Sequence, residues 1–146
     1  MNSYVGVTLV VCLIFGTIVI NASCDGSDLI GPENELEVTN VTDYFEFQVT
    51  ALNAVTDSLT YSWENTGTCA TFDQAHHHTG GRFTIAILDA DSRTMALVFR
   101  QCDSECGGEI SWSSQTQTGT PGKWTVAVSL RRASGDIGFS LQKADP

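Results

Sequence analysis

Three consecutive histidines, His76, His77 and His78, are the residues whose chemistry stands out first. Neutral imidazole nitrogens bind zinc, copper or nickel, and two histidines in a loop are able to chelate one ion. Successive residues of a strand point to opposite faces, so three in a row converge on one ion only where the chain bends. Residues 79–81, Thr-Gly-Gly, offer such a bend, and Asp73 is the only nearby carboxylate to serve a metal-dependent hydrolase as its base. A metal site is one hypothesis, and a solvent-exposed polar loop between strands is the alternative that we favour.

Acidic residues suggest a second kind of site. Asp89 and Asp91, with Asp103 and Glu105 further along the chain, are candidates for oxygen ligands to calcium. Calcium takes roughly six to eight oxygens, and the Asp-Ala-Asp-Ser run at 89–92 is much shorter than a dedicated calcium loop. Aspartate side chains also cap their own backbone in tight turns. A hairpin turn is therefore the simpler interpretation of this run.

The three tryptophans raise the question of sugar binding, because flat aromatic faces stack on sugar rings. Trp63 and Trp124 fall in the apolar phase of alternating runs, so we expect both in the core. Trp112 lies between Ser111 and Ser113 and is expected at the surface, which makes it the candidate for stacking on a ligand. No Gly-x-Ser-x-Gly motif occurs and all histidines are adjacent, so we expect no acyl-transfer catalysis.

The first two dozen residues have the pattern of an export signal. Residues 5–20 are apolar and uncharged, shorter than the roughly 20 residues of a membrane span and typical of a secretory signal. Ala22 and Ser23 directly before Cys24 resemble the end of a bacterial lipobox. We predict a lipoprotein-type signal peptide over residues 1–23, with Cys24 lipidated. Cleavage near Ala22 and a retained N-terminal anchor are the alternatives, and all three place the following chain outside the cytoplasm.

The chain is strongly acidic, with 17 acidic against 7 basic residues and a net charge of −10. This charge argues against nucleic acid or an anionic lipid surface as a partner. The acidic residues of the segment 25–37 lie among Gly, Ser, Pro and Asn. We therefore predict an acidic flexible tether over residues 24–42, which holds a folded domain, residues 43–146, away from a membrane. No residue pattern indicates a cofactor.

Three cysteines remain in the predicted folded domain: Cys69, Cys102 and Cys106. In an oxidising compartment we expect one disulfide and one spare thiol. Cys102 and Cys106 enclose a short segment that is followed by two glycines, which suits a small disulfide-closed loop. A bridge from Cys69 to either of them is the competing pairing.

From residue 43 onward, apolar and polar residues alternate in short runs separated by turn residues. No window of comparable length has a helical repeat. Short strands at a spacing of roughly ten residues, each with one apolar face, predict an antiparallel, jelly-roll-like β-sandwich. About eight such strands are expected, near residues 45–51, 59–63, 70–72, 83–87, 95–99, 110–112, 124–130 and 137–141.

Three of these runs together resemble bacterial pre-peptidase C-terminal (PPC) domains. They are Arg-Phe-Thr-Ile-Ala-Ile-Leu-Asp-Ala-Asp-Ser-Arg at 82–93, Thr-Pro-Gly-Lys-Trp-Thr-Val-Ala-Val at 120–128 and Ser-Gly-Asp-Ile-Gly-Phe-Ser-Leu-Gln at 134–142. The resemblance covers residues 43–143 in pattern. It implies a small β-sandwich that serves secreted proteins as an accessory or binding module and is not itself catalytic.

Taken together, these patterns predict a non-catalytic, membrane-anchored lipoprotein outside the cytoplasm, a binding or structural module of the cell envelope. Its partners would be the membrane, through the lipid on Cys24, and an envelope protein or glycan. Two alternatives remain. One is a metal-binding protein or metal-dependent hydrolase that uses the histidines at 76–78, and the other is a carbohydrate-binding module that uses Trp112.

Overall fold

Antiparallel strands make up most of the residues that the computed structural model describes, 29–104 and 106–145, and the predicted all-β fold is confirmed. Within these residues no helix has the length and apolar character needed to cross a bilayer. The predicted signal peptide and Cys24 lie outside the described residues. The elements are the 3-10 helix η1 (Pro32–Asn34) and the strands β1 (Glu37–Val41), β2 (Tyr44–Asn65), β3 (Cys69–Leu88), β4 (Thr94–Cys102), β5 (Ile110–Gln115) and β6 (Gly122–Ala144).

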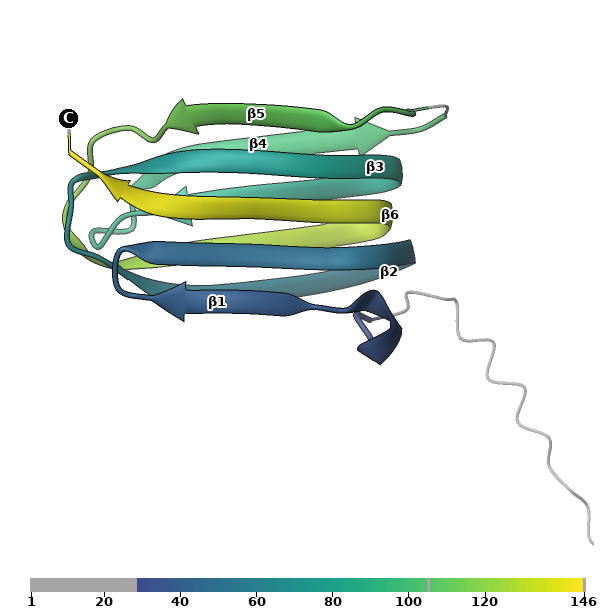
Figure 1. The fold of residues 1–146 in the computed structure, drawn as a ribbon, viewed down its shortest axis with the longest axis horizontal. Coiled ribbons are helices and arrows are strands. Elements are labelled where there is room, and N and C mark those ends of the chain that lie inside the picture. The colour runs from purple at the N-terminus through teal and green to yellow at the C-terminus, as the bar shows by residue number, and fades with distance from the viewer. Residues whose placement is uncertain (1–28, 105, 146) are drawn as a thin grey trace, which may run out of the picture.

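Three long strands build both layers of a sandwich. β2, β3 and β6 have 22, 20 and 23 residues, and each doubles back so that its two halves lie in opposite layers (Figure 1). The front layer has the order β1-β2-β6-β3-β5 and uses residues 44–49 of β2, 137–144 of β6 and 69–78 of β3. The rear layer has the order β2-β6-β3-β4 and uses residues 57–65, 122–130 and 82–88 of the same strands.

Left-handed backbone conformations produce these bends. The pairings of β2 and β3 with β6 shift register where the strands fold over. Ala54 of β2 (φ 55°), Gly81 of β3 (φ 70°) and Arg132 of β6 (φ 50°) all lie there. A residue in this conformation within a β-bulge bends the strand and increases its twist. At Gly81 a Cβ atom would collide with the carbonyl oxygen of Arg132, so the crossing requires glycine.

The core lies between the layers and is rich in aromatic rings. Trp63 and Trp124 are fully buried and meet edge to face at 5.8 Å, which confirms their predicted place. Phe139 stacks on Phe47 with ring centroids 5.3 Å apart. Burying each such side chain contributes about 1.5–3 kcal/mol. Both layers are therefore held by one shared core.

The sheet begins earlier than the sequence indicated. β1, which the sequence analysis placed in the tether, pairs with residues 44–48 of β2. Asn34 of η1 is 2% exposed, and its Nδ2 donates to the carbonyl oxygen of Ala51 at 3.0 Å. All five residues of β1 are exposed, so the strand has no apolar face that an alternating pattern could reveal. The folded part thus includes residues before 43.

The cysteine pairing follows the first of the two expectations. Cys102 at the end of β4 forms a disulfide with Cys106, with the two Cα atoms 5.7 Å apart. Cys69 is a buried free thiol whose sulfur lies 3.5 Å from Thr118 Oγ1.

Candidate functional site

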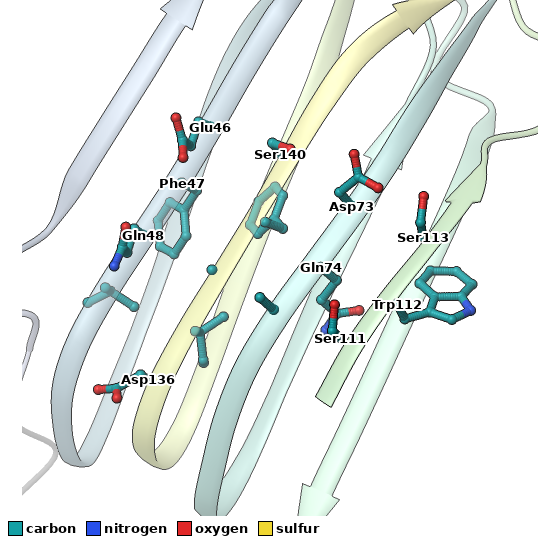
Figure 2. A pocket seen from close by; sticks show the side chains of 15 residues that line it. Glu46, Phe47, Gln48, Asp73, Gln74, Ser111, Trp112, Ser113, Asp136 and Ser140 are labelled. Atoms are coloured by element: carbon teal, nitrogen blue, oxygen red, sulfur yellow. The ribbon is translucent and has the colours of Figure 1, made fainter. Parts of the chain in front are cut away.

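A groove of about 430 Å³ crosses the outer face of the front layer. Its lining comes from four neighbouring strands, β2, β6, β3 and β5, and Figure 2 shows the lining side chains on these strands. None of these strands contributes more than five residues to it, so the groove exists only through their pairing.

Strand register places four polar side chains in one line across the groove. Glu46 of β2 pairs with Ser140 of β6, Ser140 with Asp73 of β3, and Asp73 with Ser113 of β5. Directly opposed residues project from the same face of a sheet, and neighbouring strands lie about 4.8 Å apart. We call these four residues the polar row. It presents carboxylate and hydroxyl groups at regular intervals over about 14 Å.

The neighbouring register line forms the floor. Gln48, Gly138, Ala75 and Ser111 are paired across the same four strands. The two central residues have no side chain or only a methyl group, which leaves a hollow beside the polar row. Asp136 lines the groove further along β6. Because the inward residues of these strands are packed in the aromatic core, the floor is held rigidly.

The fold already holds two of the three carboxylates in the groove. Glu46 accepts a hydrogen bond from the Tyr44 hydroxyl at 2.8 Å, and this contact raises the pKa of Tyr44. Asp136 accepts one from the backbone N–H of Ala51 at 2.8 Å. Asp73 has no hydrogen-bond partner among the described residues, which leaves its oxygens available to a ligand. No lysine or arginine lines the groove in the described part of the chain, so its potential is negative and disfavours anionic ligands.

Trp112 is exposed, as expected, and belongs to the lining of the groove, at its β5 edge. The residue pairs with buried Gln74, so its side chain leaves β5 on the core side. The ring meets Phe72 edge to face at 5.9 Å and remains 45% exposed. Figure 2 shows the indole at the outer edge of β5. The flanking Ser111 and Ser113 project from the outer face of the layer, on the side of the polar row.

All three histidines belong to strand β3, so the favoured interpretation of a solvent-exposed loop is wrong, although His77 is exposed. His76 and His78 are 5% and 7% exposed, whereas His77 points to solvent, as strand alternation requires. The rings of His76 and His78 meet Phe83 at 5.2 and 5.1 Å. Burial lowers the pKa of both, and Arg100 and then His78 lower that of His76 further. In the described ranges, no three His, Cys, Asp or Glu residues are placed to hold a metal.

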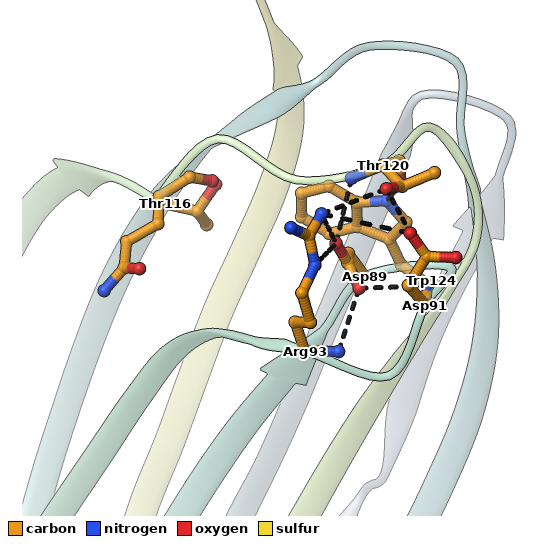
Figure 3. A network of polar contacts seen from close by, with 7 residues as sticks. Asp89, Asp91, Arg93, Thr116, Thr120 and Trp124 are labelled. Carbon is orange, nitrogen blue, oxygen red and sulfur yellow. Dashed lines mark hydrogen bonds and ion pairs between the residues drawn. The ribbon is translucent and has the colours of Figure 1, made fainter.

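Asp89 and Asp91 cap a turn, and groups of the protein itself donate hydrogen bonds to their carboxylates (Figure 3). The side chain of Asp89 is fully buried and accepts hydrogen bonds from the backbone N–H groups of Asp91, Arg93 and Thr120. The guanidinium of Arg93 pairs with it at 2.7 Å. Burial alone would raise the pKa of Asp89, but these hydrogen bonds outweigh it and lower the pKa to about 2. A resident arginine in this position favours the turn interpretation over calcium binding.

Neither a protein-family model nor a curated protein sequence matches this chain. Among solved structures, the carbohydrate-binding module TmCBM61 in complex with β-1,4-galactotriose is similar at 12% identity and a TM-score of 0.49, over 80% of this chain and 88% of that one. The CBM36-1 domain of a xylanase from a Trinervitermes trinervoides hindgut metagenome has 10% identity and a TM-score of 0.42, over 74% and 86%. The module CBM6cm-2 of Cellvibrio mixtus lichenase 5A with cellotriose has 10% and 0.39, over 75% and 86%. These values assign no family, and the resemblance to PPC domains stays a prediction.

The polar row is not recognisable from the sequence alone. Glu46 and Asp73 sit in the polar phase of two alternating runs, where most residues only meet solvent. The available signal was a glycine in the polar phase of a third run, Gly138, because a missing side chain on an outer face marks a hollow. Pairing across four strands was needed to connect these residues.

Proposed function

We propose that this protein is a carbohydrate-binding module that holds a neutral oligosaccharide in the groove of the front layer. This proposal is based on the polar row, which lies beside a floor of small residues. Carboxylate and hydroxyl groups in a line are acceptors and donors for sugar hydroxyls, and a hydrogen bond to a charged group contributes about 1.5–3 kcal/mol. The absence of basic side chains in the described lining favours neutral sugars over uronic acids or sulfated sugars.

In this arrangement the oligosaccharide lies across the strands. Hydroxyl groups donate to Asp73 and Glu46, while Ser140 and Ser113 donate or accept as the sugar requires. The rings rest over Ala75 and Gly138, where a larger side chain would exclude them. A row of about 14 Å accommodates a short oligosaccharide and so favours binding within a chain of sugars over recognition of a single ring.

We infer binding without cleavage. Glycoside hydrolysis generally uses two carboxyl groups, one as acid and one as base or nucleophile. In the groove one oxygen of Glu46 accepts from Tyr44 and one oxygen of Asp136 accepts from the backbone of Ala51, so Asp73 is the carboxylate with both oxygens unengaged among the described residues. This unequal engagement of the three carboxylates supports a role in holding the ligand rather than in cleaving it.

The test is calorimetric titration of the purified protein with a panel of neutral and acidic oligosaccharides. For the neutral sugar that binds, Asp73→Ala should raise Kd about tenfold or more, because a charge-assisted hydrogen bond is lost. Glu46→Ala should also weaken binding. Glu64→Ala is the matched control, since it removes the same side chain from the rear half of the same strand. Failure of every neutral glycan to bind, or equal affinity of Asp73→Ala and wild type, would refute the proposal.

We also propose that the module is exported and held at a membrane through a lipid on Cys24. The apolar run and the Ala-Ser-Cys junction support this, and a disulfide within the domain suits an oxidising compartment. Intact mass measurement of the membrane fraction should show a chain that begins at Cys24 and carries acyl groups. A soluble, unprocessed chain would contradict it.

A further inference from the structure

A second hollow, of about 540 Å³, lies where the long strands bend, and three arginines line it. They are Arg82 of β3 and the neighbours Arg131 and Arg132 of β6. The whole chain has only 7 basic residues, and its net charge is −10. Nearly half of its positive side chains therefore meet at one hollow, which makes this a local positive centre on an acidic protein.

The pairing of the strands brings these charges close together. Arg82 and Arg131 are directly opposed in the β3–β6 ladder. The register shift beside them adds a residue on β6, and Arg132 follows in a left-handed conformation with φ of 50°. Like charges in directly opposed positions destabilise a sheet. The bend thus fixes an arrangement that is unfavourable by itself.

The described protein groups compensate this charge only in part, because one carboxylate faces three arginines in the lining. The ion pairs in the described part of the chain involve Arg93 and Lys143, and none involves the three arginines of the hollow. The carboxylate in the lining, Asp103, accepts two contacts from Gln101 Nε2 at 2.9 and 2.7 Å. The three guanidinium groups therefore have their donors available to a ligand.

We propose that this hollow binds a tetrahedral oxyanion, the phosphate or sulfate group of a monoester. Planar guanidinium forks match such oxygens in bidentate pairs, and an anion between Arg82 and Arg131 removes the repulsion that their pairing creates. The negative charge of the rest of the protein does not prevent binding, because charges beyond about 8 Å are largely screened at physiological salt. The hollow is separate from the groove, which has no arginine in its described lining, and does not depend on glycan binding there.

The experiment compares sodium phosphate and sodium sulfate with sodium chloride at equal ionic strength. Thermal unfolding and calorimetry are measured for wild type, Arg131→Gln and Arg82→Gln, with Lys123→Gln as a control of equal charge change outside the hollow. Phosphate or sulfate should raise the Tm of wild type and of Lys123→Gln above the value in chloride. Each arginine variant should bind about tenfold more weakly or not at all, and should melt at or above the wild-type temperature in chloride.

Equal effects of all three salts, or an unchanged phosphate affinity in both arginine variants, would overturn the proposal. If a variant does not fold, amide shift perturbation in wild type decides the question, because phosphate must then move the signals of residues 131 and 132 and not those of Lys123. Glucose 6-phosphate and vesicles containing phosphatidic acid separate the two sources of such a group, a phosphorylated sugar and a lipid headgroup.

Discussion

Replacing His78 by leucine tests the consequence of burying histidines in this core. His78 Nε2 is buried and has no hydrogen-bond partner among the described residues, and such an unsatisfied group costs about 1–3 kcal/mol. The variant also loses the hydrogen bond between His78 and the backbone of Gly80, worth about 1 kcal/mol. Leucine has a similar volume, so we expect the free energy of unfolding at neutral pH to stay equal or rise by up to about 2 kcal/mol.

The larger effect is expected at acid pH. Burial lowers the pKa of His78 below its ordinary value of 6.5, so the unfolded chain takes up a proton that the folded protein resists. Stability is therefore present above about pH 6.5 and is lost as the pH falls below it. If the folded protein stays unprotonated at about pH 5, the loss reaches at most about 2 kcal/mol for each buried histidine. His76 contributes in the same direction, and Arg100 of β4 strengthens its shift.

Urea unfolding at about pH 7.5 and about pH 5, followed by the fluorescence of the buried Trp63 and Trp124, measures this difference. His78→Leu should lose up to about 2 kcal/mol less than wild type between the two pH values. The control His77→Leu removes a histidine that points to solvent and should follow the wild-type profile. Identical pH dependence of His78→Leu and wild type would refute the reasoning, as would a flattened profile in His77→Leu.

Three further substitutions test the framework around the sites. Asp89→Asn should lower the Tm at neutral pH and remove a stability loss that wild type shows as the pH falls from 3.8 to about 2, which thermal melts over this range will detect. Phe139→Ala should lower the free energy of unfolding by about 3–5 kcal/mol in urea titrations, because it empties the space beneath the groove floor. Gly81→Ala should cost at least about 1–3 kcal/mol in the same assay, whereas Gly107→Ala, where a Cβ meets no atom within 4 Å, should be nearly neutral.

The fold could be predicted from the sequence wherever one face of a strand is buried. The alternation around Phe47, Ile85 and Val128 places each of these residues in the core, and all three are at most 1% exposed. Periodicity could not show that two predicted strands are halves of one long strand. The bends interrupt the alternation through bulges at positions such as Arg132, and a bulge resembles a turn when only the sequence is available.

The histidines and β1 show the opposite difficulty, in which residue type conflicts with position. Polar type predicted exposure for His76 and His78, yet the phase of β3, continued from Phe72, points both inward. Tertiary packing overrides the preference of the side chain here, and the cost appears as unsatisfied nitrogens. β1 was missed for a different reason: it pairs through its backbone while all its side chains remain exposed, so no buried face marks it as a strand.

The groove could not be predicted from sequence patterns, because strand pairing brings its residues together from four strands. Glu46, Asp73 and Ser140 are separated along the chain and become neighbours only through register, which a shift of one residue would destroy by turning a side chain to the other face. The packed rings under the floor fix that register, since Phe47 and Phe139 cannot turn outward without exposing a large apolar area. The buried face of these strands thus determines the exposed one, so the polar row is specified by the same residues that stabilise the fold.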